Sequence, residues 1–353
     1  MSDEAPTGDT AATAPIGANG FYGIRYRVEG RCMESPIVSP YGVQAIQVLT
    51  ILLGAPLVSG VIAHLEGRLQ GRRGPRILQP YYDIVKFFSK ETLVSSDASW
   101  AFLAGPVVAF ACYMTVPMLI PVLTTFPLPL GFSGDILGGG FILALAGFSV
   151  ALSGAESGAP YAQLGSSRAM TFGALIEPTI LFVIFAVALI THTDLPYALS
   201  ATIRSSTSQM VRPSHVFAAV AFFLVVLVDT GRIPVETHSG TLEFGMIDEA
   251  RTLEHSGPAF ALLKWGSTMK QLILYTILIN VFIAPWGLAS TGKWTSVLLA
   301  VAALIGKAIV VGLIFAVVDN LFSKLRLFKI TEFIASAFLL AVLSVLVFYV
   351  GGG

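Results

Sequence analysis

Residues 229–257 read DTGRIPVETHSGTLEFGMIDEARTLEHSG and hold six acidic side chains, in a chain in which only 12% of residues are charged. At about 100° per helical residue, the step from Glu236 to Glu243 and the step from Glu243 to Glu254 each return to within roughly 20° of one direction. A helical backbone would therefore place three carboxylates on one stripe. Gly240 and Gly245 argue against one unbroken helix, since each costs about 1 kcal/mol relative to alanine. The stretch predicts short helical pieces that carry acids between membrane spans.

Long apolar runs dominate the sequence on both sides of this stretch. Hydrophobic residues make up 55% of the chain, and a typical globular protein has about 25% charged residues. The runs approach the ~20 residues that cross a bilayer, whereas a β-barrel would show short alternating segments. The sequence therefore predicts an all-α, polytopic integral membrane protein with about eight transmembrane helices. The expected spans are 43–64, 101–122, 137–152, 172–190, 214–228, 272–288, 296–318 and 334–350.

Basic residues are distributed unevenly between the loops. Fourteen of the 21 lysines and arginines fall in four alternate loops, six fall on the other side, and Lys307 lies inside a span. The positive-inside rule then predicts that these four loops and the acidic stretch are cytoplasmic and that both termini face outward from the cell membrane. Residues 1–40 lack the pattern of a cleavable signal peptide. They are predicted to form a disordered extension, followed by a transmembrane domain over residues 41–353.

Ionisable residues inside or beside the predicted spans are candidates for function. Glu177 and Lys307 fall within spans, and Asp229 and Asp319 fall near span ends. A charge at the bilayer centre costs about 2.5–3.5 kcal/mol even on the lenient insertion scale. One interpretation is a relay whose protonation or pairing changes during a cycle. The alternative is a fixed, buried ion pair, for instance between Lys307 and one of the acids; we favour the relay because such groups are functional candidates by default.

The first basic loop is the second region with a clear pattern. Residues 66–91 read EGRLQGRRGPRILQPYYDIVKFFSKE, in which an arginine cluster precedes a segment that mixes apolar residues with Asp83, Lys86 and Lys90. This composition is typical of an amphipathic helix that lies in the membrane interface or under a partner subunit.

Several kinds of site are not indicated by the sequence. The chain has two cysteines, and an iron–sulfur cluster normally needs four thiolates. The five histidines lack metal-ligand spacing, and there is no nucleophile motif and no phosphate-binding loop. The net charge of zero gives no field that would attract nucleic acid. We therefore expect no cofactor in this chain and no nucleic-acid partner.

Five segments, in order, resemble one family of membrane proteins. The segment RRGPRILQPYYDIVKFFSKE closely resembles the first cytoplasmic loop of the membrane subunit that complex I (NADH:quinone oxidoreductase) shares with energy-converting, membrane-bound nickel–iron hydrogenases. YAQLGSSRA at 161–169, Glu177, DTGRIPVE at 229–236 and LEFGMIDEARTLEHSG at 242–257 are similar to the family's later motifs. The last of these and KLRLFKI at 324–330 resemble the hydrogenase branch, which includes formate-hydrogenlyase-type members.

The resemblance implies a non-redox membrane-anchor and coupling subunit of an energy-converting hydrogenase-type complex. Catalysis, iron–sulfur clusters and a nickel–iron centre are then expected in hydrophilic partner subunits, and antiporter-like subunits are expected beside this chain in the bilayer. The reaction of the hydrophilic arm would be linked to translocation of protons or sodium. The implied ion-coupling residues are Glu177, Asp229, Arg232, Glu236, Glu243, Asp248, Glu249, Glu254, Lys307 and Asp319, and the implied docking residues are Arg72, Arg73, Arg76, Asp83, Lys86 and Arg168.

Three alternatives remain open. The chain could be the quinone-chamber subunit of a complex I-type enzyme, which would bind quinone near the first basic loop. It could also be a stand-alone ion transporter or channel. Finally, loop acids such as Glu243 and Glu254 could simply pair with arginines of a partner subunit.

Overall fold

A computed structural model describes residues 38–131, 134–205, 212–231, 248–321 and 327–351. These residues form helices with one isolated bridge, between Thr124 and Ala289, and no strands. The predicted N-terminal extension lies outside the described residues except for residues 38–40. The elements are α1 (Pro40–Leu69), α2 (Gln79–Phe88), α3 (Trp100–Leu119), α4 (Ile136–Ala155), α5 (Pro160–Thr191), α6 (Pro196–Ser205), α8 (Pro213–Asp229), α9 (Asp248–Thr252), α10 (Gly257–Ile277), the π-helical η1 (Leu278–Ile283), α11 (Trp294–Leu321) and α12 (Leu327–Val350).

The described helices confirm the predicted fold class. Seven are long and apolar enough to cross a membrane, and α8 is a shorter apolar helix of 17 residues. At 1.5 Å per residue α8 is about 25 Å long, which is less than the ~30 Å of the hydrocarbon core. The amphipathic loop helix is α2, in which Ile84 is buried and Tyr82 and Val85 are exposed.

Two predicted spans begin earlier in the structure than in the sequence analysis. α5 starts at Pro160, so that residues 161–169, including Arg168, are helical and do not form a loop. α10 starts at Gly257, so that Lys264 and Lys270 also lie within a helix. In an 18-residue window of the α10–η1 span, 78% of the residues are buried inside the protein. Lys270 is half-buried and Lys264 is exposed, and their charges lower the hydropathy of the first half of α10.

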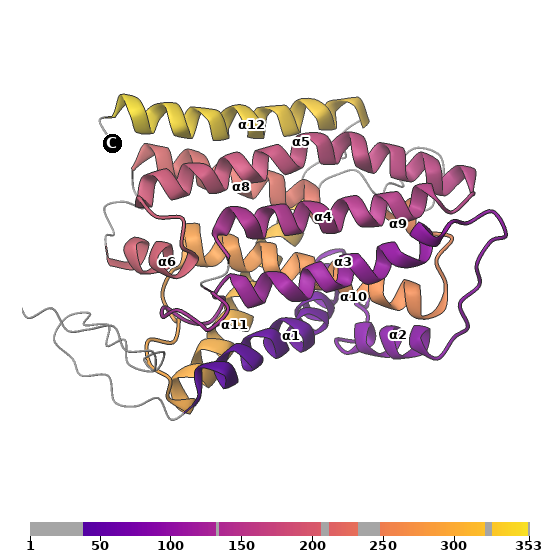
Figure 1. Cartoon of the computed structure of the whole chain (residues 1–353), viewed down its shortest axis with the longest axis horizontal. Coiled ribbons are helices and arrows are strands. Elements are labelled where there is room, and N and C mark those ends of the chain that lie inside the picture. The colour runs from indigo at the N-terminus through magenta and orange to yellow at the C-terminus, as the bar shows by residue number, and fades with distance from the viewer. Residues whose placement is uncertain (1–37, 132–133, 206–211, 232–247, 322–326, 352–353) are drawn as a thin grey trace, which may run out of the picture. The chain divides into compact units, whose positions relative to one another are not determined.

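The helices pack in two adjoining groups (Figure 1). In the first group, α3 packs on α4, α4 on α5, and α5 on α8 and α12. In the second group, α1 packs on α11, and α10 contacts both α1 and α3. α9 lies against α5 and α4, and α2 lies against α10. These contacts place α8, which carries Asp229, against α5, and they join α10, which carries Lys270, to the same group through α3.

Prolines inside the helices create hydrogen-bonding positions between helices. Pro56 of α1 has no N–H to donate to the carbonyl four residues earlier, and the indole Nε1–H of Trp265 donates to that Leu52 carbonyl at 2.8 Å. The adjacent Leu53 carbonyl accepts a hydrogen bond from the Tyr81 hydroxyl. These two bonds fasten α1 to α10 and α2, and the first of them uses the carbonyl that Pro56 leaves free.

A buried glutamine organises the irregular segment after α3. The Gln47 amide nitrogen donates to the carbonyls of Pro117 and Ile120, and its oxygen accepts from the backbone N–H groups of Val122 at 2.9 Å and Leu123 at 3.2 Å. Buried backbone polar groups must be paired. Gln47 thus allows a non-helical segment to lie in the interior.

Candidate functional site

The site begins with an ion pair between two helices. Lys270 of α10 places its Nζ 2.6 Å from Oδ1 of Asp229, with the two side chains 17% and 14% exposed. Asp229 is the last residue of α8, where the helix dipole disfavours a negative charge. The ammonium of Lys270 compensates for both this dipole and the burial of the carboxylate.

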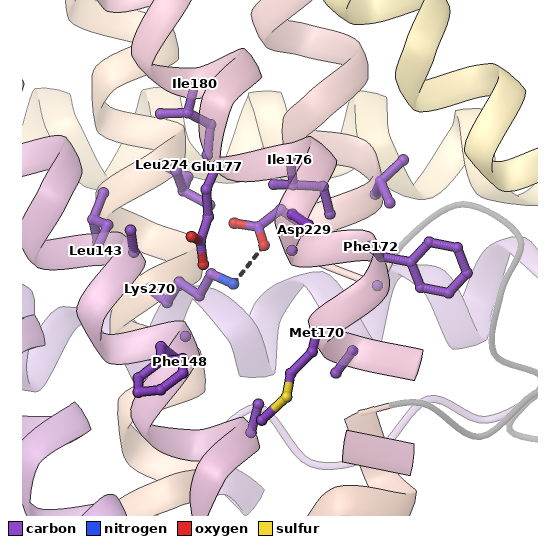
Figure 2. Close-up of a pocket in the computed structure, with 18 of the residues that line it drawn as sticks. Leu143, Phe148, Met170, Phe172, Ile176, Glu177, Ile180, Asp229, Lys270 and Leu274 are labelled. Atoms are coloured by element: carbon purple, nitrogen blue, oxygen red, sulfur yellow. Dashed lines mark hydrogen bonds and ion pairs between the residues drawn. The ribbon is translucent and has the colours of Figure 1, made fainter. Parts of the chain in front are cut away.

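Glu177 lies beside this ion pair, in the middle of α5. Its carboxylate occupies a slot between two glycines: a Cβ added at Gly147 of α4 or at Gly173 of α5 would lie 3.6 Å from its Oε1. Figure 2 shows the Glu177 carboxylate directed into the same space as the Lys270 ammonium and the Asp229 carboxylate. Pro178 follows Glu177 and cannot donate to the Ala174 carbonyl, which removes one ladder bond of α5 at this level. The structure therefore brings together Glu177 and Asp229, two of the residues that the sequence predicts for ion coupling.

The three groups line a cavity of about 350 Å³ between α4, α5, α8 and α10. Its wall is mostly Gly, Ala, Leu, Ile and Phe, and its charged residues are Glu177, Asp229, Lys270 and Arg251. Interactions between charges are stronger in apolar surroundings than in water. A change in protonation at any of these groups would therefore act strongly on the others.

A second, larger cavity of about 1070 Å³ adjoins the first. It is bounded by the end of α2, by α3 and by α10, and its wall includes the aromatic residues Phe87, Phe110, Tyr113 and Phe260. Asp229, Gly231, Arg251 and Lys270 line both cavities. The Asp229–Lys270 ion pair consequently stands where the two cavities meet.

Small residues seat the short helix α9 at this junction. A Cβ added at Gly165 of α5 would lie 2.6 Å from Cβ of Ala250, and one added at Gly154 of α4 would lie 2.6 Å from the carbonyl oxygen of Arg251. α9 can approach this closely because both positions lack a side chain. That approach brings Arg251 to the boundary between the cavities.

His255 lines the larger cavity and is buried between α9 and α10. The Ser153 hydroxyl donates to the Phe102 carbonyl at 2.7 Å and lies 2.7 Å from Nε2 of His255, and the imidazole stacks on the Phe102 ring at 4.2 Å. Pro106 frees the Phe102 carbonyl from the α3 ladder. Burial lowers the pKa of His255 from 6.5 to about 4, so its imidazole is neutral at physiological pH.

Other predicted ion-coupling residues lie elsewhere. Lys307 of α11 donates to the carbonyls of Ala284, at 2.9 Å, and Trp286, and its Nζ is 5.7 Å from the centre of the Trp286 ring. Asp319 lies in the last turn of α11, and Glu254 is exposed between α9 and α10. Within the part of the chain that the structure describes, these three residues line neither cavity. Arg232, Glu236 and Glu243 lie outside the described residues, as do the side chains of Asp248 and Glu249 at the start of α9.

The predicted docking residues are largely accessible. Arg72, Arg73 and Arg76 are exposed in the segment between α1 and α2, and Lys86 is exposed on α2. Asp83 accepts a hydrogen bond from Gln79 at 2.8 Å within the same helix. Arg168 is half-buried on α5.

Sequence reasoning did not identify Lys270, Arg251 or His255 as site residues. Lys270 was assigned to a loop. The one available signal was the short span that ends in Asp229, because a carboxylate near membrane depth needs a cation as its partner. The functional context of His255 depends on contacts with Ser153 and Phe102, which precede it in the sequence by 102 and 153 residues. No local sequence pattern around His255 predicts these contacts.

Comparisons with known proteins agree with this architecture. Residues 43–350 match the family described as NADH dehydrogenase. Formate hydrogenlyase subunit 4 of Escherichia coli (strain K12) is 31% identical over 283 residues, covering 80% of this chain and 90% of that protein. NADH-ubiquinone oxidoreductase chain 1 of Balaenoptera physalus is 30% identical over 227 residues, covering 61% and 67%.

A solved structure has the same fold. A chain of the membrane-bound sulfane sulfur reductase, an archaeal respiratory membrane complex, superimposes with a TM-score of 0.74 at 20% identity, covering 88% of this chain and 99% of that chain. Together with the apolar helices, these matches identify a multi-pass membrane protein. The chain belongs to the NADH dehydrogenase family of membrane subunits, and within that family it is more similar to formate hydrogenlyase subunit 4 than to chain 1 of the NADH-ubiquinone oxidoreductases.

Proposed function

We propose that this chain is a non-redox coupling subunit of an energy-converting, hydrogenase-type complex. It would hold a hydrophilic arm that carries the iron–sulfur clusters and a nickel–iron centre, and would link the reaction of that arm to ion movement through antiporter-like membrane subunits. The observation that carries the proposal is the Asp229–Lys270 ion pair beside Glu177, because it places three ionisable side chains in a cavity inside a bundle of membrane helices. The match to formate hydrogenlyase subunit 4 supports the type of complex.

The arrangement suits coupling because the larger cavity adjoins the ion pair. The predicted acidic stretch connects Asp229 at the end of α8 to α9, and α9 carries Arg251 to the wall of both cavities. A change in charge in the arm above this stretch would act on Asp229 and, through Lys270, on Glu177. Under the predicted topology, this path runs inward from the cytoplasmic side.

Glu177→Gln in the purified whole complex tests the proposal. Glutamine keeps the shape of the side chain and cannot release a proton, so we expect ion pumping in proteoliposomes to fall at least about tenfold, with the arm still attached. Gly306→Ala is a matched control in α11, where an added Cβ meets open space. Pumping that remains at the wild-type level in Glu177→Gln would contradict the coupling role.

A second candidate function, the quinone-chamber subunit of a complex I-type enzyme, is favoured by the larger cavity. Its volume of about 1070 Å³ and its aromatic wall suit an apolar ring compound. Nickel content, hydrogen evolution and quinone reduction, measured on the complex isolated through a tag on this chain, separate the two. Nickel with hydrogen turnover supports the hydrogenase type, and quinone reduction that a quinone-site inhibitor abolishes, without nickel, supports the complex I type.

A further inference from the structure

We propose that Lys270 exchanges between Asp229 and Glu177, and that this exchange transfers protons from the larger cavity to the smaller one. The proposal deepens the proposed function, since it assumes that Glu177 takes part in ion coupling, and it identifies Lys270 as the positioning residue. The starting point is the place of the ion pair, where both cavities are lined by Asp229 and Lys270.

Among the described residues, two carboxylates face the Lys270 ammonium. In the structure its Nζ contacts Asp229 at 2.6 Å, and Figure 2 shows the Glu177 carboxylate facing the same ammonium from the other side of the cavity. The described wall of the smaller cavity contains no other acidic, hydroxyl or amide side chain. An ammonium that leaves Asp229 must stay paired to avoid the cost of a lone charge at this depth. On the described wall of the smaller cavity, Glu177 can accept it.

The shape of the site permits the movement. Lysine carries a compact charge on a flexible four-carbon chain, and Glu177 lies between Gly147 and Gly173, which place only hydrogen atoms beside its carboxylate. Arg251 of α9 is the second basic group at the junction and keeps its charge at all physiological pH values. It therefore contributes a constant field, and the groups whose protonation can change are Asp229, Glu177 and Lys270.

The exchange conserves charge and protons at every step. The proposed cycle starts with Lys270 paired to Asp229 and with a proton on Glu177. A proton that reaches Asp229 from the larger cavity neutralises its carboxylate and releases Lys270. The ammonium then pairs with Glu177, whose proton leaves into the part of the smaller cavity lined by Gly140 and Leu143. Transfer of the remaining proton from Asp229 to Glu177 returns Lys270 to Asp229, so one proton has moved from the larger cavity to the smaller one.

Carbodiimide labelling of the purified complex tests this exchange without turnover. Dicyclohexylcarbodiimide reacts with protonated carboxyl groups in apolar sites, and peptide mass spectrometry locates the product. We expect Glu177 to be labelled in the wild type. In Asp229→Asn, Lys270 has lost its first partner and pairs with Glu177, and because an adjacent cation favours the charged carboxylate by one or more pKa units, labelling should fall at least about tenfold.

The double variant Asp229→Asn with Lys270→Met decides whether the lysine is responsible. It removes the ammonium from the Asp229→Asn background, so labelling of Glu177 should return to the wild-type level. Wild-type labelling in Asp229→Asn, absence of labelling in the wild type, or absence of recovery in the double variant would each overturn the exchange. Failure of the proposed function is distinguishable, because normal pumping in Glu177→Gln would refute the coupling role while leaving this labelling pattern unaffected.

Discussion

Lys270 and Lys307 lie in membrane helices but have different kinds of partner. Lys270 pairs with a carboxylate at a cavity, whereas Lys307 donates to two carbonyls just beyond the end of η1. The second arrangement supports a fixed role, since the last carbonyls of a helix lack partners within it. It differs from the ion pair with an acid that the sequence suggested for Lys307 as the alternative to a relay.

We expect Lys307→Met to destabilise the purified complex while ion pumping per turnover stays at the wild-type level. A hydrogen bond to a charged group contributes about 1.5–3 kcal/mol, and methionine supplies no donor to the Ala284 and Trp286 carbonyls. Thermal denaturation and pumping in proteoliposomes, measured on the same preparation, check this expectation. Lost pumping at unchanged stability would instead support the predicted relay.

His255 makes the stability of the protein depend on pH. Its pKa is lowered from 6.5 to about 4 in the folded protein, so the unfolded chain binds more protons between these values. The stabilisation is complete above pH 6.5 and is lost as the pH falls towards 4, with a total of about 3 kcal/mol.

His255→Gln should remove this part of the pH dependence. The glutamine amide can replace the contact of Nε2 with Ser153 but does not titrate. Thermal denaturation of both forms between pH 7 and pH 4 gives the comparison: we expect the wild type to lose stability more steeply. Parallel curves would show that His255 is not the group responsible.

At the scale of elements, proline positions determine which helices are joined. Pro56 of α1 frees the Leu52 carbonyl, which Trp265 of α10 bonds, and Pro106 of α3 frees the Phe102 carbonyl, which Ser153 of α4 bonds. These bonds lie in the interior, where an unsatisfied carbonyl is costly. The prolines therefore fix neighbours as well as bending the helices.

The bond between Trp265 and Leu52 permits a double-mutant test. Trp265→Phe keeps an aromatic ring but removes the indole N–H, and should cost about 1–3 kcal/mol because the Leu52 carbonyl is left without a donor. Pro56→Ala restores a backbone N–H to that carbonyl. In the Pro56→Ala background, Trp265→Phe should therefore cost clearly less, as thermal denaturation would show; equal costs would indicate that the loss is one of packing alone.

The sequence predicts elements better than it predicts their ends. Eight apolar runs locate the eight long or apolar helices, because lipid-facing and core-facing residues are both hydrophobic. The missed first half of α10 contains Lys264 and Lys270, whose charges lower the local hydropathy although the helix is buried by its neighbours. Only part of the site could be predicted from the sequence. Glu177 and Asp229 are ionisable residues in apolar sequence and are therefore easy to recognise, whereas the roles of Lys270 and His255 depend on contacts between distant helices.

At the scale of the whole molecule, the basic surface near α2 is the predicted attachment site for the hydrophilic arm. Lys86 is exposed on α2, and Arg72, Arg73 and Arg76 are exposed just before it. An array of accessible cations suits an acidic partner surface, and such contacts weaken as salt increases.

Lys86→Ala should reduce the amount of arm subunits that co-purify with this chain, and more so at higher ionic strength. A rim charge of this kind contributes up to about 1 kcal/mol, so we expect a several-fold change in retention. Lys293→Ala, on the side predicted to face outward, is the control. Equal retention of the arm in both variants at all salt concentrations would remove Lys86 from the docking surface.

The position of α12 has a consequence for the biogenesis of the protein. Ile330 of α12 lines the smaller cavity, and α12 packs against α5 and α8, which carry Glu177 and Asp229. Because α12 follows every other described helix in the chain and domains form from the N-terminus during synthesis, the ribosome completes this wall of the cavity after the charged residues have been inserted. Until then the charged residues lack this part of their cover, so we expect a nascent chain arrested before α12 to be more sensitive to membrane proteases than the finished subunit.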